Sequence, residues 1–468
     1  MPRPDHRRVV PRLAVAWIAL FAVYGLGLVV PAAPDRALTS AEAHRLLVAH
    51  SLVTDGDIDL LDDYQAGAWR SWGGVQGTGP RDVLRPTVAL QLVRPDGEDG
   101  RAVPQPTAPG GFLEPSSMGL GALLAPPYWL GRAIGGADSA GGRIAAQLWC
   151  AGLLALAFAL AIPIARRIVP DPWATWGVLA MALSPPAILG ATEIAAGAPA
   201  AALLTGAVAA ALAVREQPRT GAALTCALLC ALLWWIWLPL APVALLVAAA
   251  LARWMRRRRR GLTGFVALEL LLLSAFVFLT VHDRIYGGPT PWAPAAGWTL
   301  PTDVDGPGDA LARLATGPLG WLVDARYGLL RWAPIAALGG VAGWRLWRAR
   351  RSRLARLFAD EIHVEVIVAF LLLVVLAVAV PYSVLSPWPA TSWLAGPATV
   401  VGLPVLGAAA AWAWQRVPRT GMALAALTLV ATAWLLGAGL LTGDVGVAPP
   451  TGPLPWGGIE RALPVLGQ

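Results

Sequence analysis

The sequence lacks lysine altogether and has only three cysteines and few charged side chains, which make up 14% of its 468 residues. Hydrophobic residues make up 57%, and the mean hydropathy is +0.60. Soluble domains carry roughly 25% charged residues, so this composition excludes an ordinary soluble protein and indicates an integral membrane protein. The net charge of +8 does not indicate nucleic-acid binding, because the arginines cluster in short connections between apolar runs.

Several kinds of chemistry have no counterpart in the sequence. Cys150, Cys226 and Cys230 all fall inside apolar runs, which predicts small core residues and no disulfide framework. The sequence contains no Walker loop, no Ser/His/Asp order typical of hydrolases and no paired Cys/His spacing typical of metal sites. These absences exclude the common nucleotide, nucleophile and zinc motifs.

Eleven apolar runs are long enough to cross a membrane, which takes roughly 17–25 residues. They lie at 13–31, 142–164, 174–191, 197–214, 221–236, 238–254, 262–281, 328–347, 364–384, 394–414 and 421–441. Clustered tryptophan and proline divide 221–254 into two runs near Trp237. Pro31 to Pro34 make a poor cleavage site, so the first run is predicted to be a retained helix. We predict one all-α polytopic membrane domain over residues 1–468.

The arginines predict the orientation of this domain. The short connections 192–196, 236–238 and 385–393 contain no arginine, whereas the connections that alternate with them are rich in it. Because cytoplasmic loops carry excess basic residues, we predict a cytoplasmic N-terminus in the cytoplasmic (inner) membrane. The loops 32–141 and 282–327 and the tail 442–468 are then extracytoplasmic. Gly110–Ile134, broken by Pro126-Pro127, is predicted to be a helix on the outer surface.

The first of these loops holds an acid-rich segment, 39–64. Its first half predicts a short helix capped by Thr39 or Ser40. Its second half predicts a turn with five aspartates: Asp55, Asp57, Asp59, Asp62 and Asp63. Asp55 and Asp57 form the D-x-D of soluble glycosyltransferases and the start of a calcium loop, but Leu60 and Ala66 occupy the required Gly and Glu positions, which excludes a standard calcium loop. A looser divalent-cation site and a solvated acidic turn are both compatible with the pattern.

Other polar residues lie at the predicted outer ends of the spans. Glu42 fits either a general base at a dry rim or a helix-capping residue. Glu193 is a second outer carboxylate, or an exposed loop residue. Arg284 and Arg326 fit either phosphate binding or contact with lipid head groups.

Six short motifs follow one another along the chain: Glu42, the run SLVTDGDIDLLDDY from Ser51, LLAPPYWLG from Leu123, HDRIYGGP from His282, DARYGLLRWAP from Asp324, and Trp393–Ala398 with Leu403-Pro404. In this order they resemble the motifs of the GT-C superfamily of bacterial membrane glycosyltransferases, of the protein mannosyltransferase and aminoarabinose transferase type. Three positions depart from the family pattern: Ala41 replaces an aspartate, Ala398 replaces an arginine and Arg45 replaces an aromatic residue.

The resemblance implies a GT-C-like fold and inverting transfer of a sugar from a polyprenyl-phosphate donor to a glycan, lipid or protein acceptor. Glu42 would be the base, Asp55 and Asp57 would orient the sugar or a divalent cation, and Arg284 and Arg326 would hold the phosphate. The remaining substrate-binding residues would be His44, Glu193, His282, Tyr286, Asp324 and Tyr327. No cofactor other than that cation is expected, and the partners would be the two substrates and membrane lipids, not nucleic acid. The alternatives are a lipid-sugar transporter or flippase, or an inactive scaffold of the same fold.

Overall fold

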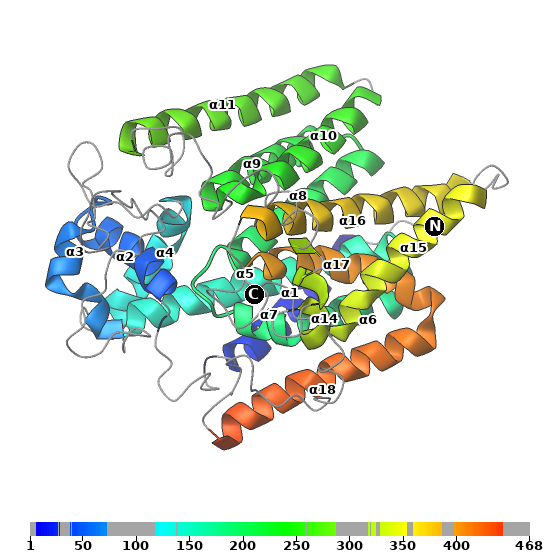
Figure 1. Ribbon diagram of the computed structural model, residues 1–468. Helices are drawn as coiled ribbons and strands as arrows, with labels where there is room; N and C mark the ends of the chain where they lie inside the picture. Colours follow the sequence, from blue (N-terminus) through cyan, green and yellow to red (C-terminus); the bar gives the residue numbers. More distant parts are fainter. Residues whose placement is uncertain are drawn as a thin grey trace, which may run out of the picture.

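The computed structural model describes residues 6–26, 28, 38, 40–72, 118–136, 139–257, 260–286, 317–318, 320–323, 328–352, 359–385 and 397–442. Over these residues the chain forms α-helices and short 3₁₀ turns, without a β-strand (Figure 1). The longer helices are α1 His6–Leu26, α2 Ser40–Thr54, α4 Met118–Gly135, α5 Gly141–Arg166, α6 Trp173–Ala182, α8 Gly197–Glu216, α9 Thr220–Ile236, α10 Ala241–Arg257, α11 Gly261–Tyr286, α15 Ala337–Ser352, α16 Ala359–Leu385, α17 Pro397–Arg416 and α18 Pro418–Thr442. The short elements are α3 Leu61–Ala66, η1 Ala68–Trp72, α7 Pro185–Gly190, η2 Leu238–Leu240, α14 Leu329–Trp332 and η3 Pro334–Ala336.

Six helical segments in the described part of the chain are long and apolar enough to cross a membrane. They are Gly141–Arg166, Gly197–Glu216, Leu238–Arg257, Gly261–Ile285, Ile362–Pro381 and Pro418–Gly437. The protein is therefore an all-α membrane protein. Three shorter apolar helices, Leu13–Leu26, Trp173–Ala182 and Thr220–Ile236, have 10–17 residues, so the total of eleven spans stays a prediction.

Proline positions explain where the helices differ from the predicted spans. The run 174–191 divides into α6 and α7 because Ser184 precedes Pro185, and a residue before proline avoids helical geometry. The run 328–347 is interrupted in the same way at Pro334. Both are corrections to a single uninterrupted span. The predicted division of 221–254 is confirmed at the level of helices, because α9 ends at Ile236 and α10 begins at Ala241.

The structure also corrects the predicted break in α4. This helix continues from Met118 to Gly135 with Pro126 and Pro127 inside it. Two prolines remove two backbone donors, but α4 packs along α2 and α5 over its length. Small residues allow that approach, since a Cβ on Gly121 would lie 2.3 Å from Val48 Cγ1. Tertiary packing therefore outweighs the local proline signal.

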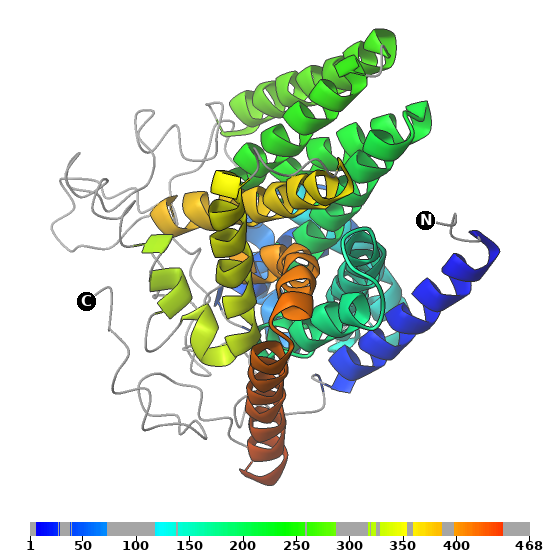
Figure 2. The same ribbon diagram turned by 90° about the vertical axis from the view of Figure 1, so that its right-hand side faces the viewer.

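The centre of the bundle is α17, which the other long helices surround (Figures 1 and 2). Its side chains from Thr399 to Trp414 are buried, and it packs against α5, α6, α8, α15 and α16. A helix that is apolar on every side belongs in such a position. Small residues bring its neighbours close: a Cβ on Gly177 of α6 would lie 2.6 Å from the Cβ of Ala411.

This contact gives a prediction for stability. Gly177→Ala adds a methyl group between α6 and α17, and the helices must separate at a cost of about 1–3 kcal/mol. The matched control is Gly340→Ala in α15, where nothing lies within 4 Å of the added Cβ. Thermal unfolding in detergent should give a lower midpoint for Gly177→Ala than for Gly340→Ala. Equal midpoints would show that α6 and α17 are not packed this closely.

The bundle has two chemically different ends. At one end, Arg167 after α5 contacts Glu216 at the end of α8 at 3.3 Å, and Arg215 contacts His363 of α16 at 3.1 Å. At the other end, α4 packs against α5 and α2 packs against α4; α2, α3 and α4 lie at the left of Figure 1. From Arg143 to Arg166, α5 spans about 35 Å, which separates the arginine-rich end from the end that carries the acid-rich segment.

Candidate functional site

Glu42 and Arg45 of α2 hold the backbone of one residue, Ile194, in the turn between α7 and α8. Glu42 Oε1 accepts a hydrogen bond from the Ile194 backbone N–H at 2.9 Å, and Arg45 Nη1 donates to the Ile194 carbonyl at 3.2 Å. Residues three apart in a helix share a face, so both side chains reach the same turn. The Glu42 side chain is buried. This contact joins two segments that lie 152 residues apart in the sequence.

Glu193 directly precedes Ile194, and the environment of its carboxyl group changes the pKa of that group. Burial raises the pKa of the Glu193 carboxyl to about 7; the negative charge of Glu42 acts in the same direction, and Arg45 opposes it. The two carboxylates therefore interact, and Glu193 exchanges its proton near neutral pH. A carboxyl group of this kind is suited to proton transfer because its pKa is close to the working pH.

A second arginine completes the group. Arg143, near the start of α5, interacts electrostatically with Glu42. We call Glu42, Arg45, Arg143 and Glu193 the acid–arginine cluster; it draws on α2, α5 and the α7–α8 turn. Its two carboxylates and two guanidinium groups can bind a polar or anionic substrate and move a proton. Perturbed carboxyls beside cations are typical of functional sites.

Neither arginine was among the site residues predicted from the sequence, where Arg45 appeared only as a departure from the family pattern. Arg45 carried a signal, because it follows Glu42 by one helical turn in a segment predicted to be helical. Arg143 carried none, since nothing local in the sequence relates the beginning of α5 to α2. His44, which was predicted to bind substrate, is fully buried. It lies only two residues from Glu42, so it occupies a different side of α2.

The structure does not bring Asp55 and Asp57 to this cluster. Both are exposed and lie beyond the end of α2, roughly 18 Å from Glu42 along the helix axis. Asp57 Oδ1 accepts from Ser51 Oγ at 2.8 Å and from the Asp59 N–H at 3.1 Å, and Thr54 Oγ1 donates to Asp55 Oδ2 at 2.6 Å. These local bonds shape a turn. Over the described residues, no three His, Cys, Asp or Glu side chains are grouped to hold a metal ion.

One aspartate of the acidic turn, Asp63, is buried, although the sequence left open that the whole turn is solvated. Asp62 is exposed, whereas Asp63, in the first turn of α3, is only 4% exposed. The solvated reading is therefore corrected for Asp63. Its carboxyl group is covered because α3 lies against α2 at His50, which is 3.3 Å away.

The remaining predicted residues lie elsewhere or outside the described chain. His282 of α11 is buried and stacks on Phe278, and its Nδ1 lies 2.8 Å from the Phe278 carbonyl oxygen. Arg284 is exposed at the end of the same helix. Tyr286 is the last residue of α11, and its side chain lies outside the described residues, as do Asp324, Arg326 and Tyr327. Of these residues, the structure describes the side chains of His282 and Arg284, and both belong to α11, which is not one of the segments that form the acid–arginine cluster.

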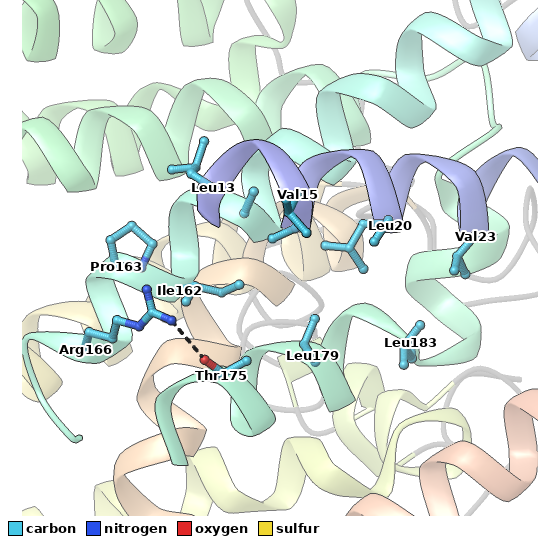
Figure 3. Close-up of a pocket in the computed structure, with 13 residues that line it drawn as sticks. Leu13, Val15, Leu20, Val23, Ile162, Pro163, Arg166, Thr175, Leu179 and Leu183 are labelled. Carbon is cyan, nitrogen blue, oxygen red and sulfur yellow. Dashed lines mark hydrogen bonds between the residues drawn. The ribbon is translucent and has the colours of Figure 1, made fainter. Parts of the chain in front are cut away.

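Two apolar grooves lie on the sides of the bundle. One, between α1, α5 and α6, has a volume of about 530 Å³, and Arg166 and Thr175 lie at one end of it (Figure 3). The other, of about 420 Å³, runs between α9, α10 and α11. Neither groove is lined by a carboxylate. Their apolar walls are typical of surfaces that face lipid chains.

Comparisons with known proteins do not extend this picture. No protein-family model matches the chain, and no significant match is found among curated proteins or solved structures.

Proposed function

We propose that this protein is a GT-C-like glycosyltransferase that transfers a sugar from a polyprenyl phosphate to a glycan, lipid or protein. The acid–arginine cluster supports this function, and the ordered motifs of the sequence supply the reaction class. Fold resemblance alone gives no activity, so the proposal depends on the chemistry of the cluster. Its central observation is the contact of buried Glu42 with Ile194, which puts its carboxylate beside Glu193.

The proposed reaction assigns a role to each part of the cluster. The acceptor hydroxyl gives its proton to Glu42 as its oxygen bonds to the anomeric carbon of the sugar. The bond from that carbon to the phosphate breaks, and the polyprenyl phosphate leaves with the electron pair. Below about pH 7 Glu193 keeps its proton, so the pair carries one negative charge, which we assign to Glu42. Arg45 and Arg143 limit the repulsion between this charge and the donor phosphate.

The same proposal places the cluster on the extracytoplasmic side. The arginine-rich ends of α5 and α8 meet about 35 Å from it, and excess arginine is typical of the cytoplasmic side. A polyprenyl-phosphate donor suits the opposite side, because no soluble nucleotide sugar is needed there. Arg284 and Arg326 are proposed to contact the donor phosphate, as the sequence motifs imply.

Cysteine labelling in intact cells tests this orientation. The three native cysteines are buried, so a single introduced cysteine at an exposed position reports its own side of the membrane. Asp55→Cys should react with a membrane-impermeant maleimide, and Arg219→Cys should react only after the cells are opened; both native side chains are exposed. The opposite labelling pattern would place the acid–arginine cluster on the cytoplasmic side, and the proposal of a polyprenyl-phosphate donor would be rejected.

The function itself is tested by profiling glycans and lipid-linked sugars in cells that lack the protein. We expect one polyprenyl-phosphate sugar to accumulate and one glycan, lipid or protein to lose that sugar, with both changes reversed by the wild-type gene. An unchanged profile of every carrier and every product would reject the glycosyltransferase.

The half-buried Glu193, whose pKa is raised to about 7, also supports a second candidate, a proton-coupled lipid-sugar transporter. Ionisable groups inside membrane bundles commonly carry protons. For a transporter, the intact lipid-linked sugar would accumulate on the cytoplasmic side in the deletion strain, and purified protein would move it between vesicle leaflets without cleaving it. For the transferase, cleavage of the donor would occur in detergent, where no leaflets exist.

A further inference from the structure

Four side chains meet where the acid-rich segment packs on α4; they come from α2, α3, η1 and α4. His50 of α2 lies with Nδ1 2.7 Å from the hydroxyl of Tyr128 in α4 and with Nε2 3.3 Å from Asp63 Oδ1 in α3. Trp72 of η1 donates its indole N–H to the same hydroxyl at 3.3 Å. We call these four residues the cap cluster. None of them takes part in the acid–arginine cluster.

The rings of the cap cluster also pack on one another. His50, Trp72 and Tyr128 form three edge-to-face pairs with centroid separations of 5.7–6.2 Å, a favourable geometry for aromatic groups. Asp63, Trp72 and Tyr128 are each at most 4% exposed. The cap cluster therefore fixes α3 and η1 on α2 and α4 through buried contacts.

The hydrogen bonds are consistent with two protonation states. With one proton shared by the acid and the imidazole, the Asp63 carboxyl donates to Nε2 and Nδ1–H donates to the Tyr128 oxygen, which also accepts from Trp72. After that proton leaves, Nε2–H donates to the Asp63 carboxylate and the Tyr128 hydroxyl donates to Nδ1. The second state leaves a buried charge, and Asp63 Oδ2 has no hydrogen-bond partner within the described residues. Burying a charge without enough partners is costly.

The charged groups that face the cap cluster add to this cost. Asp55 and Asp57 from the turn after α2 and Asp62 from α3 are negative, and among the described residues Arg132 from α4 is the cation that acts on Asp63. Burial, reinforced by the three carboxylates, raises the pKa of Asp63 to about 7. Burial lowers the pKa of His50, so His50 does not replace the lost proton. Stability from Asp63 is fully present below its ordinary pKa of 3.8, decreases as the pH rises, and is lost once the pH has passed about 7.

We propose that His50, Asp63 and Tyr128 form a one-proton lock that holds α3 and η1 on α2 and α4 and opens as the pH rises through neutrality. At the proposed active site, Tyr128 acts as a positioning residue. A Cβ on Gly142 would lie 2.5 Å from its ring, so the ring rests on the peptide that precedes Arg143. The lock thus joins the helix of Glu42 and Arg45 to the residue before Arg143. This last step rests on the proposed function, whereas the lock itself does not.

Hydrogen–deuterium exchange of the purified full-length protein in detergent tests the lock without any substrate. Protection factors, which correct for the pH dependence of chemical exchange, are compared at about pH 6 and about pH 8 for peptides covering 61–72. For a carboxyl whose pKa falls from about 7 to its ordinary value on opening, the open fraction should rise about tenfold over this range. Unchanged protection in the wild type would overturn the lock.

Two variants distinguish the effect of the Asp63 proton from the effect of side-chain packing in the cap cluster. Asp63→Asn imitates the neutral carboxyl and should abolish the pH step while keeping high protection. Asp283→Asn, an exposed carboxyl at the end of α11, is the matched control and should keep the tenfold step. If Asp63→Asn does not fold, Tyr128→Phe is the second test: it lacks the hydroxyl, so its protection at about pH 6 should fall to the wild-type level at about pH 8. A wild-type pH step in Asp63→Asn, or wild-type protection in Tyr128→Phe, would overturn the proposal.

If sugar transfer is detected, its pH profile tests the positioning role. Opening of the lock should lower wild-type activity above neutral pH, and Asp63→Asn should remove this loss. If the cap cluster were only a structural contact, the variant would not change the shape of the pH profile. A profile of unchanged shape would overturn the link to the active site. Hydrogen–deuterium exchange is measured without substrate, so it tests the lock independently of the proposed function. If protection changes with pH but the protein transfers no sugar, the lock stands and only the glycosyltransferase function is rejected.

Discussion

Glu42→Gln is expected to lower sugar transfer by about 10²–10⁴-fold, the usual contribution of a general base. Glutamine has nearly the size of glutamate, and its carbonyl oxygen can still accept the hydrogen bond from the Ile194 N–H, which is 2.9 Å long in the wild type. The turn between α7 and α8 should therefore keep its place. What the variant loses is the ability to take a proton from the acceptor hydroxyl.

The measurement is cleavage of a polyprenyl-phosphate sugar by purified protein, together with complementation of the deletion strain. Glu216→Gln is the matched control: it makes the same substitution at the arginine-rich end, where Glu216 contacts Arg167. The control should retain wild-type transfer. Full activity in Glu42→Gln would show that Glu42 only anchors the turn, and the role of base would have to be assigned elsewhere.

A shorter side chain separates anchoring from proton transfer. Glu42→Asp keeps a carboxylate but withdraws it from Ile194 by one methylene group. We expect partial activity together with a lower thermal midpoint, since a buried N–H would lose its acceptor at a cost of about 1–3 kcal/mol. Glu42→Gln should show the reverse combination, with a normal midpoint and little activity.

Apolar runs and prolines predicted most of the helices correctly, because each run has to satisfy its own backbone hydrogen bonds within lipid. The break between α9 and α10 follows from local residues in this way. The prolines of α4 were misleading because packing on α2 and α5 holds that helix together. A local signal fails where contacts from distant segments contribute more than the local preference.

Local sequence signals predicted even less of the acid–arginine cluster and of the cap cluster. The sequence indicated Glu42 and Glu193 separately as outer carboxylates, but their meeting depends on how α2 docks on the α7–α8 turn. Asp63 could not be told from its neighbours Asp59 and Asp62 in the acidic turn. Its burial depends on His50 and Tyr128, and Tyr128 comes from a helix far along the chain. The sequence shows where the carboxylates are, but the packing of distant helices determines which of them are buried.

The second large effect expected is on the pH dependence of stability, through Glu193. Its pKa is raised from the ordinary 4.5 to about 7 in the folded protein. Between these values the unfolded chain has released the proton and the folded protein still holds it. Stability should therefore fall as the pH rises from about 4.5 to 7 and level off above, by at most about 3 kcal/mol.

Glu193→Gln should remove this slope because glutamine cannot release a proton. Thermal midpoints in detergent, measured across that range for wild type and variant, give a difference curve that isolates Glu193 from Asp63, which titrates in the same range in both proteins. The variant should gain relative stability with rising pH and reach its full advantage above about pH 7. A flat difference curve would mean that water reaches Glu193 freely, and the carboxyl pair would then lose the restricted environment on which the proposed chemistry depends.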